Sequence, residues 1–324
     1  MKRKTWFWII GLSLLGLLIC GGFIGLGVWA AGQFDGSRNL NLGFGDGVAI
    51  IHVEGVIVPG EAPPPNPFGV SSSGAAYSQT IIDHLESANE DEKVKAIILA
   101  VDSPGGSVFA SDEIHLKIKE IDKPIIASMG SLAASGGYFV SAPADEIWAS
   151  PHTLTCSVGV IMQFLNLDGF SDEYGVTAVT ITSGKFKDTG NPFREFTAEE
   201  RVLLQDLIDE AYDAFVDVVA EGRSMTRESA REVADGRICT GKQAQKMGLV
   251  DNLGYLPDVI DRAAELGGLE LEEDEEPRLI EYSHDAGLAD ALIASLNRPG
   301  PLEELKQILH FRAGSPLMYL YLGP

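Results

Sequence analysis

A serine and a lysine stand out as a pair that could perform nucleophilic catalysis. Ser135 lies in the run Met129-Gly-Ser-Leu-Ala-Ala-Ser-Gly-Gly-Tyr138, where small neighbours leave its hydroxyl open to a substrate. Lys187 lies in the run Ser183-Gly-Lys-Phe-Lys-Asp188. A lysine amine can take the proton of a serine when its surroundings exclude water and favour the uncharged form. These residue types therefore predict a Ser/Lys hydrolase.

Two glycines could supply backbone donors to the same reaction. Gly106 follows a predicted strand and precedes a predicted helix, and Gly136 comes directly after Ser135. Glycine is needed where backbone N–H groups must face an oxyanion without a side chain in the way. For Gly106 alone, an ordinary glycine turn is an equally good interpretation. Two converging donors would form an oxyanion hole, in which each donor contributes about 2.7–4 kcal/mol in comparable sites.

The elements that must position these residues alternate between strands and helices. A largely apolar strand is expected at 94–101, a helix at 109–121 and a strand at 123–128 that leads to Ser135. This alternation predicts a parallel sheet with its reactive residues where strands end and helices begin. Further strands are expected at 48–58, 145–149, 158–162, 176–182 and 249–254, and further helices after the capping box of Thr197 with Glu200 and at 256–266.

The N-terminus predicts a retained membrane anchor. Lys2, Arg3 and Lys4 precede an apolar stretch from Trp6 to Ala31 that carries no charge and is long enough to cross a bilayer. The basic cluster keeps the N-terminus cytoplasmic and sends the body across the membrane. Cleavage after Ala30 and lipidation at Cys20 are the weaker alternatives.

Charge and cysteine content exclude some classes of protein. The chain has 24 basic and 47 acidic residues, a net charge of −23, which argues against nucleic-acid binding. Outside the anchor only Cys156 and Cys239 remain, so the fold should not be a disulfide scaffold. The acidic run 270–276 is predicted to be a solvated linker, and no metal site is expected. The apolar tail 316–322 predicts an edge strand or a subunit contact, with a self-ligand in the substrate groove as the alternative.

Four segments, in this order along the chain, carry a family resemblance. They are Asp102-Ser-Pro-Gly-Gly-Ser107, Ala133-Ala-Ser-Gly-Gly-Tyr138, Ser150-Pro-His-Thr-Leu-Thr-Cys-Ser-Val-Gly-Val160 and Gly184-Lys-Phe-Lys-Asp188. Together they resemble the signal peptide peptidase A family of bacterial membrane-anchored proteases, from about Val48 to Gly267. The resemblance implies an α/β fold of the Clp protease and crotonase type, built of repeated ββα units, behind an N-terminal transmembrane helix.

The resemblance also implies a role for each site residue. Ser135 would be the nucleophile, Lys187 the general base and Ser157 the residue that orients the lysine, with Gly106 and Gly136 as the oxyanion hole. No metal or cofactor is needed. This chain has Cys156 where the family pattern has glycine. Because the base must be uncharged, we expect Lys187 to be buried and hydrogen-bonded to Ser135 and Ser157.

Anchor and resemblance together predict the organisation of the molecule. We expect a cytoplasmic tip and anchor at 1–31, a linker at 32–46, a protease domain at 47–270, and an acidic linker with a tail at 271–324. The protein would be a single-pass protein of the bacterial plasma membrane with its catalytic domain outside the cytoplasm. Family members form rings, so a homo-oligomer is expected, with the dyad completed across adjacent subunits. The expected substrates are apolar peptides such as signal-peptide remnants.

Several alternatives remain open at this point. His152 could be the base of a Ser-His-Asp triad with Asp145 or Asp102, and Lys185 competes with Lys187 as the catalytic lysine. The segment 236–243 nearly spells a phosphate-binding loop, although a helix cap fits it better. A crotonase-like acyl-CoA enzyme and a membrane scaffold that has lost catalysis are the rival functions.

Overall fold

The computed structural model describes residues 45–63, 74–272, 275–282 and 318–320. These residues belong to one compact unit that begins at Gly45. The predicted anchor, including Cys20, lies outside the described residues, as does most of the predicted linker at 32–46. Among the described helices, none has the length and apolar character needed to cross a membrane.

A predominantly parallel sheet forms the centre of this unit. Its main path runs in the order β10-β7-β6-β4-β1-β11, with every neighbouring pair parallel. The strands are β1 (Gly47–Glu54), β4 (Val94–Ser103), β6 (Ile125–Ala134), β7 (Glu146–Ala149), β10 (Asn252–Leu253) and β11 (Leu279–Tyr282). The end of β6 also pairs with β8 (Leu154–Cys156), which pairs antiparallel with β9 (Ile238–Thr240). The predicted parallel strands are confirmed along the main path, but the whole sheet is mixed because β8 and β9 are antiparallel.

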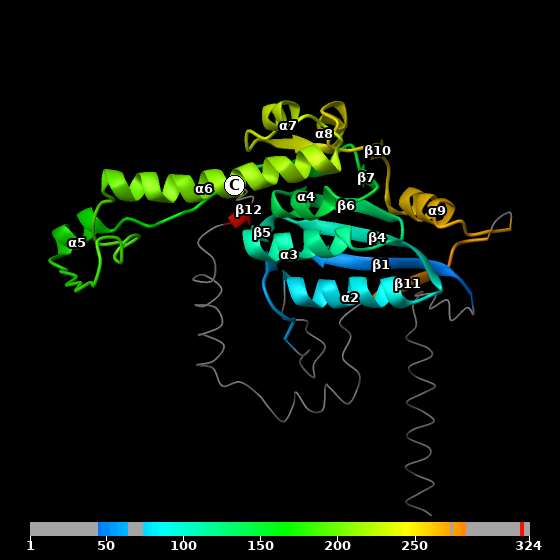
Figure 1. The fold of residues 1–324 in the computed structure, drawn as a ribbon, viewed down its shortest axis with the longest axis horizontal. Coiled ribbons are helices and arrows are strands. Elements are labelled where there is room, and N and C mark those ends of the chain that lie inside the picture. Colours follow the sequence, from blue (N-terminus) through cyan, green and yellow to red (C-terminus); the bar gives the residue numbers. More distant parts are fainter. Residues whose placement is uncertain (1–44, 64–73, 273–274, 283–317, 321–324) are drawn as a thin grey trace, which may run out of the picture. The chain divides into compact units, whose positions relative to one another are not determined.

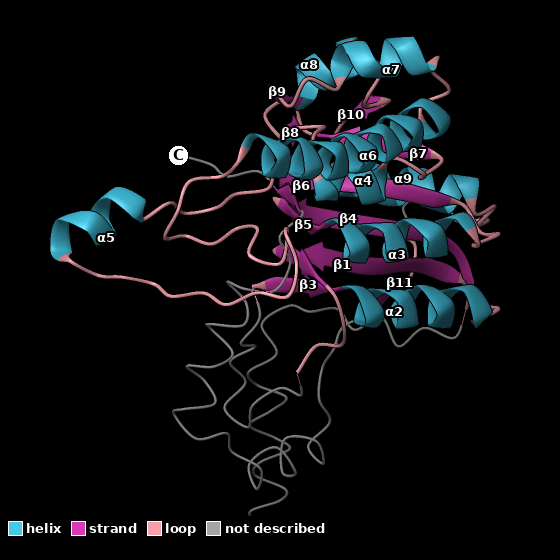
Figure 2. Cartoon of the chain, turned by 60° about the vertical axis from the view of Figure 1, so that its left-hand side comes forward, coloured by secondary structure: helices cyan, strands magenta, loops and turns pink. Residues whose placement is uncertain are grey.

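Helices cover both faces of the sheet, which explains why its central strands are apolar runs. One face carries α2 (Ser78–Glu90), α3 (Val108–Lys119), α4 (Gly136–Ser141) and the C-terminal part of α6 (Ala198–Gly222), as Figures 1 and 2 show. The other face is covered by α9 (Leu256–Leu266), which packs Val259 against Ile50 and Ile98. Two short helices, α7 (Arg227–Val233) and α8 (Gly241–Lys246), complete this part of the fold.

A second, smaller sheet lies beside the first. Its order is β12-β5-β2-β3, with β12 (Met318–Leu320) at the edge, antiparallel to β5 (Gly105–Ser107). The other two strands, β2 (Val56–Val58) and β3 (Ala75–Tyr77), are parallel to each other. The prediction that the apolar tail forms an edge strand is confirmed. Residues 271–324, predicted as linker and tail, thus contribute β11 to the large sheet and β12 to the small one.

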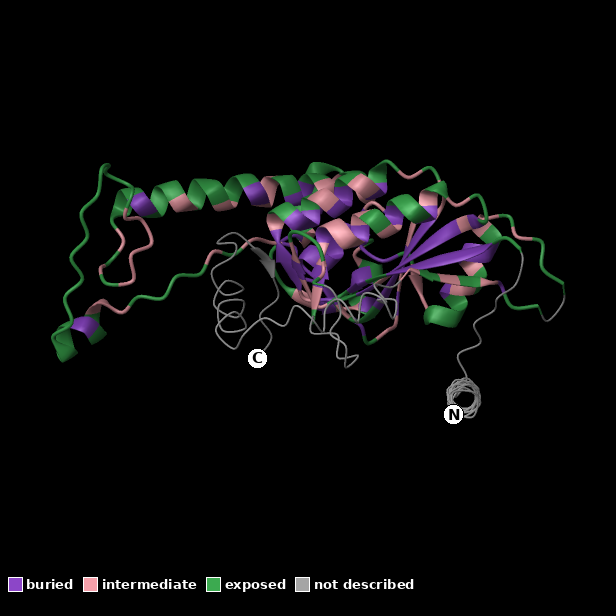
Figure 3. Ribbon diagram, turned by 90° about the horizontal axis from the view of Figure 1, so that it is seen from below, coloured by how far each residue is buried: buried purple, intermediate pink, exposed green. Residues whose placement is uncertain are grey.

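A long excursion separates β8 from α6. We call residues 162–197 the arm; it contains α5 (Asp168–Tyr174) and extends away from the two sheets at the N-terminal end of α6 (Figures 1 and 2). The N-terminal half of α6 is correspondingly exposed, whereas its C-terminal half is buried along one side (Figure 3). Most residues of the arm are exposed or only partly buried.

Two strands predicted near and within the arm are wrong. Residues 158–162 form only an isolated bridge at Ile161, and residues 176–182 form no strand. In this second segment Val179 is 83% exposed and Ile181 is 94% exposed. A β-branched run becomes a strand only when a neighbouring strand pairs with it, and the described residues offer no such neighbour here.

Helix starts were predicted more accurately. Thr197 and Glu200 form the expected capping box of α6, and α9 has the predicted bounds. The segment that resembles a phosphate-binding loop is a helix cap, because Thr240 and Gln243 form a second capping box before α8.

Candidate active site

Ser135 occupies a strained turn between β6 and α4. Its φ is +54° and its ψ is −115°, and the residue is only 1% exposed. Such a conformation costs a non-glycine residue about 1–3 kcal/mol and persists only where the surroundings enforce it. Here the Ser135 N–H donates to the Cys156 carbonyl at 2.9 Å, and the Phe139 N–H donates to the Ser135 carbonyl at 2.9 Å. The fold thus holds the predicted nucleophile at a fixed sharp corner.

The two predicted oxyanion glycines are neighbours in space. A Cβ added to Gly136 would lie 3.0 Å from the backbone nitrogen of Gly106. A Cβ added to Gly106 would lie 2.0 Å from the carbonyl oxygen of Ile57, which leaves no room for a side chain. The two peptide groups therefore meet beside Ser135, and Gly106 is required by its close approach to β2.

Ser103 braces the bend between β4 and β5, the strand that contains Gly106, a role that the sequence alone did not reveal. Its hydroxyl donates to the Gly55 carbonyl at 2.6 Å and accepts from the Gly105 N–H at 3.0 Å. Gly105 itself has a φ of +95°, so the turn depends on glycine there. The only available signal was the position of Ser103 within Asp102-Ser-Pro-Gly-Gly.

Ser157 lies near Ser135 because it directly follows Cys156, the last residue of β8, whose carbonyl accepts the Ser135 N–H. Cys156 and Ser157 both have positive φ values, +67° and +53°. The Ser157 N–H donates to the Arg237 carbonyl at 2.7 Å. Ser157 is partly exposed and lines a pocket of about 390 Å³ together with Gly159, Ile208, Tyr212 and Gly236. The structure therefore brings Ser135 and Ser157 to the same region, although no direct hydrogen bond between them is described.

Cys156 and Cys239 form a disulfide between β8 and β9, with a Cα–Cα distance of 5.5 Å. The sequence was right that the fold is not built on several bridges, but it did not predict this one. Two cysteines 83 residues apart carry no pairing signal until β8 and β9 are known to be adjacent.

Lys187 is not where the sequence predicted. It lies in the arm in a turn, its side chain is exposed, and the described contacts include no hydrogen bond from it to Ser135 or Ser157. The expectation that Lys187 is buried is therefore wrong for the single chain. The physical reason is that the arm leaves the body of the protein, where no residue of the described part of the chain excludes water from the amine.

The residue after Lys187 is nevertheless held firmly. Arg194 Nε donates to Asp188 Oδ2 at 2.8 Å, and its two Nη atoms donate to Glu200 at 2.6 and 2.9 Å. Glu200 also accepts from the Thr197 N–H at 2.8 Å as part of the capping box. Hydrogen bonds from Arg194 are the main reason why the pKa values of Glu200 and Asp188 lie below their usual range. We call Asp188, Arg194 and Glu200 the arm clamp, because they tie the lysine turn to α6.

The competing lysine is already paired. Lys185 forms an ion pair with Glu199, and its amine lies 5.2 Å from the centre of the Phe186 ring. The described contacts therefore pair Lys185 with Glu199 and do not join it to Ser135.

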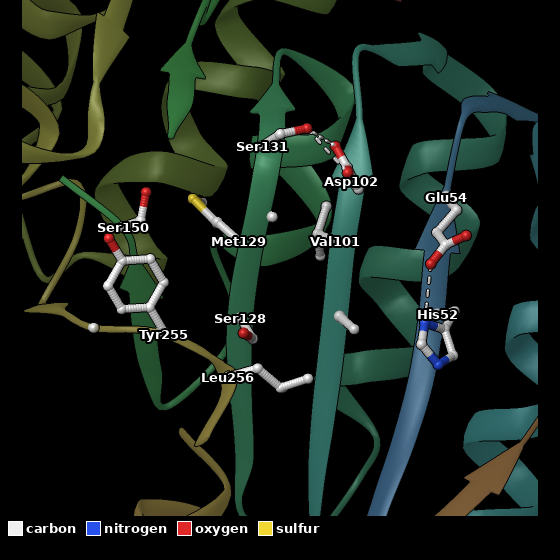
Figure 4. Close-up of a pocket in the computed structure, with 13 residues that line it drawn as sticks. His52, Glu54, Val101, Asp102, Ser128, Met129, Ser131, Ser150, Tyr255 and Leu256 are labelled. Atoms are coloured by element: carbon white, nitrogen blue, oxygen red, sulfur yellow. Dashed lines mark hydrogen bonds and ion pairs between the residues drawn. The ribbon is translucent and has the colours of Figure 1, made fainter. Parts of the chain in front are cut away.

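The alternative triad is not assembled. His152 is exposed in a turn, and Asp145 accepts a hydrogen bond from the Ile125 N–H at 2.8 Å. Asp102 accepts from the Leu132 N–H and the Ser131 hydroxyl, both at 3.0 Å, and faces a separate pocket (Figure 4). No described contact joins His152 to either carboxylate or to Ser135.

That separate pocket does not belong to the proposed chemistry. It has a volume of about 440 Å³ and lies along β1, β4 and β6 beside α9, where Figure 4 shows His52 paired with Glu54 at 3.1 Å. None of the five predicted site residues lines it. No described group of His, Cys, Asp or Glu side chains has an arrangement that could hold a metal ion.

Two protein-family models match parts of this chain. Residues 117–270 match the model of peptidase family S49, and residues 70–155 match that of Clp protease. A protein from Enterococcus faecium described as a signal peptide peptidase is 44% identical over 186 residues, 56% of this chain and 54% of the relative. A protein from Synechocystis described as a protease is 42% identical over 196 residues, 58% of this chain and 71% of the relative.

A third relative is named as a serine protease. This chloroplast protein of Arabidopsis thaliana is 35% identical over 246 residues, 74% of this chain and 36% of the relative. The chain thus spans about half of the Enterococcus relative and about a third of the Arabidopsis one. Residues 117–270, which match the model of peptidase family S49, include both Ser135 and Lys187. On this evidence the chain has a Clp protease-like α/β fold and belongs to peptidase family S49.

Proposed function

We propose that this chain is a membrane-tethered serine endopeptidase that cuts extended apolar peptides, such as the remnants of cleaved signal peptides. The observation that carries the proposal is the strained turn at Ser135 beside Gly106 and Gly136, within a chain of family S49. A serine held at a strained corner beside two backbone N–H groups suits acyl transfer, which needs a nucleophile next to oxyanion donors.

The chemistry would proceed through an acyl-enzyme. The Ser135 hydroxyl attacks the scissile carbonyl while Lys187 takes its proton, and the N–H groups of Gly106 and Gly136 hold the negative oxygen that forms. The lysine then gives its proton to the leaving amine. Water, deprotonated by the same lysine, releases the acyl group in the second half of the reaction. No metal or cofactor takes part in these steps.

The base would come from a neighbouring copy of the chain. Lys187 is exposed on the arm, and the arm carries apolar side chains that water surrounds in the single chain, including Val179 and Ile181. Ser157 lines a pocket beside α6 into which an amine from another subunit could enter. A homo-oligomer that seats one arm on the next subunit would cover the apolar surface and remove water from Lys187 together.

The small sheet supports binding of an extended peptide. The chain's own β12 runs antiparallel to β5, with Tyr319 opposite the oxyanion residue Gly106. A substrate that adds to β5 in this way would place its backbone beside Ser135 with no need for sequence-specific contacts. This mode suits a varied population of apolar peptides.

The membrane location is also part of the proposal. The apolar stretch from Trp6 to Ala31 follows a basic cluster, which supports a single-pass anchor in a bacterial plasma membrane with residues 47–270 outside the cytoplasm. Tethering would raise the local concentration of peptides released within the same bilayer.

The shared dyad can be tested by mixing two inactive variants of the full chain in detergent. Ser135→Ala keeps the lysine and Lys187→Ala keeps the serine, and each alone should show no peptide turnover. If each site joins two subunits, random co-assembly restores about one quarter of the sites. Turnover that returns on mixing supports the shared dyad. No recovery in a mixture proven by cross-linking to be co-assembled would refute it.

A rival scaffold function or acyl-CoA chemistry would give a different result with an active-site probe. A fluorophosphonate should label Ser135 in the parent chain and fail to label Ser135→Ala. A properly folded parent that neither reacts with the probe nor hydrolyses peptides would contradict the peptidase proposal.

A further inference from the structure

We propose that the Cys156–Cys239 disulfide is a positioning element of the active site, so that hydrolysis by this chain depends on the bridge being closed. The inference rests on the proposed function. It starts from the place of Cys156 in the fold, where the residue is completely buried and its carbonyl accepts the N–H of Ser135 at 2.9 Å. Any movement of the Cys156 backbone therefore moves the nucleophile's own peptide group.

Cys156 holds this position in a conformation that its side chain opposes. Its φ is +67°, and the next residue, Ser157, has a φ of +53°. Residues with a Cβ disfavour this left-handed region, and two in succession need an external restraint. A glycine at 156 would meet no such opposition.

The restraint comes from β9. Cys156 lies opposite Ile238, and the Ser157 N–H donates to the Arg237 carbonyl at 2.7 Å. Both strands have only three residues, so their ladder is short. The bridge from Cys156 to Cys239 crosses this ladder diagonally and fixes the two strands covalently across a sequence separation of 83 residues. Its position makes it the strongest link between β9 and the corner that carries Ser135.

Opening the bridge should release that corner. A dithiol reductant gives two electrons and two protons to the disulfide, which becomes two thiols while the reductant becomes a disulfide. Cys156 is then free to leave the left-handed region and turn its carbonyl away from Ser135. The close approach of Gly136 to the Gly106 nitrogen involves neither Cys156 nor β9, so we expect it to persist, with kcat falling about tenfold and KM little changed.

The test uses the full chain in detergent on a Cys20→Ala background, so that Cys156 and Cys239 are its only cysteines. Peptide turnover and the rate of Ser135 labelling by a fluorophosphonate are measured before and after treatment with dithiothreitol. Alkylation followed by mass spectrometry counts the free thiols in each sample. The expected result is two added alkyl groups and about a tenfold fall in kcat and in labelling rate, reversible on reoxidation.

Two double variants separate positioning from general stability. Cys156→Ala with Cys239→Ala removes the bridge but keeps a Cβ at 156, so its kcat should match that of the reduced parent. Cys156→Gly with Cys239→Ala removes the bridge and the Cβ together, so its kcat should recover toward the oxidised parent and ignore dithiothreitol. Rescue by glycine would not occur if the bridge merely kept the protein folded.

Two outcomes would overturn the inference alone: full turnover in a parent whose two thiols are shown to be free, or a glycine variant no more active than the alanine variant. An oxidised parent with neither turnover nor labelling would overturn the proposed function, and this inference with it. These outcomes therefore distinguish failure of the inference from failure of the proposed function.

Discussion

At the scale of single residues, backbone strain marks the site. Four non-glycine residues in the described part of the chain have positive φ, and three of them, Ser135, Cys156 and Ser157, lie together at the end of β6 and β8. Each such backbone conformation lowers the stability of the fold by about 1–3 kcal/mol relative to an unstrained one. Strained residues that the surrounding structure holds in place often cluster at functional sites, and these three cluster at the predicted nucleophile.

Gly106→Ala should damage catalysis through the oxyanion hole. The new Cβ would meet the Ile57 carbonyl oxygen at 2.0 Å, so β5 must shift and carry the Gly106 N–H away from the substrate oxygen. Loss of one donor should lower kcat by about 10²–10³. Gly74→Ala is the matched control, because a Cβ there meets nothing within 4 Å. Peptide turnover of the two variants, measured beside their thermal midpoints, checks this; equal kcat values would contradict it.

His115 should make folding stability depend on pH near neutrality. It is 5% exposed, its Nδ1 has no described partner, and burial followed by the charge of Lys119 lowers its pKa. A free histidine titrates at about 6.5, so the unfolded chain takes up the proton first as pH falls, and stability drops below that pH. The urea midpoint should therefore rise between pH 5 and 8 in the parent and rise less in His115→Gln. Equal slopes in both proteins would refute this assignment.

At the scale of elements, the sequence correctly predicted those strands and helices that depend on a local pattern of residues. The apolar run of β4, the helical spacing of α3 and the capping boxes of α6 and α8 are local signals, and these elements appear where expected. The corner at Ser135 and Gly136 was placed correctly between β6 and α4. Gly106 was placed correctly between β4 and α3, although the short strand β5 that contains it was not predicted. The neighbourhood of Ser135 was thus within reach of sequence reasoning.

The features that depend on distant partners were missed. β11 pairs with β1 although more than two hundred residues separate them, and the Cys156–Cys239 bridge requires β9 to lie beside β8. The segment 176–182 has strand-like composition, but no strand among residues 45–63, 74–272, 275–282 and 318–320 pairs with it. Burial of Lys187 was predicted from what the reaction needs, and a single chain does not provide it. Strand pairing and burial depend on the whole fold, so no local sequence pattern predicts them.

The arm clamp should position Lys187 without supporting the core. Arg194→Lys keeps the charge but loses the planar set of donors that joins Asp188 to Glu200. We expect kcat to fall several-fold, because the lysine turn is no longer fixed, with the thermal midpoint nearly unchanged. Hydrogen exchange should quicken in residues 184–196 and stay slow in β4. Arg201→Lys, which alters an arginine of α6 beside the ring of Phe196, is the control. Equal kcat in the two variants would contradict the clamp.

β12 should compete with substrate for β5. Its backbone pairs with Gly105, Gly106 and Ser107, the positions that an extended substrate would use. Deleting residues 316–324 should therefore lower KM for a peptide substrate and speed the labelling of Ser135, because β12 no longer has to leave the edge of β5 before a substrate can bind there. The measurement is the labelling rate of the truncated and full chains at equal concentration. A slower rate in the truncated chain would show instead that β12 supports the site.

At the scale of the whole molecule, the arm is the feature that one chain leaves unexplained. Its aromatic and β-branched side chains are exposed, and the N-terminal half of α6 adds Leu203 and Leu207 to the same uncovered region. Apolar surface gathered on one projecting segment usually marks an interface. The catalytic lysine of the proposed dyad lies on this segment, so assembly and catalysis should fail together.

Ile181→Asp provides the test at this scale. The side chain is 94% exposed in the single chain, so a carboxylate there should leave the thermal midpoint of the isolated fold nearly unchanged. In an assembled interface the same charge would be buried without a partner, which is strongly unfavourable. We therefore expect mass photometry to show loss of oligomers, together with loss of peptide turnover. Leu116→Asp is the matched control, an equally drastic change at an exposed apolar residue of α3, 54% exposed, and it should leave both properties intact. An Ile181→Asp chain that remains oligomeric and fully active would mean that Lys187 does not act through contact between subunits at this part of the arm.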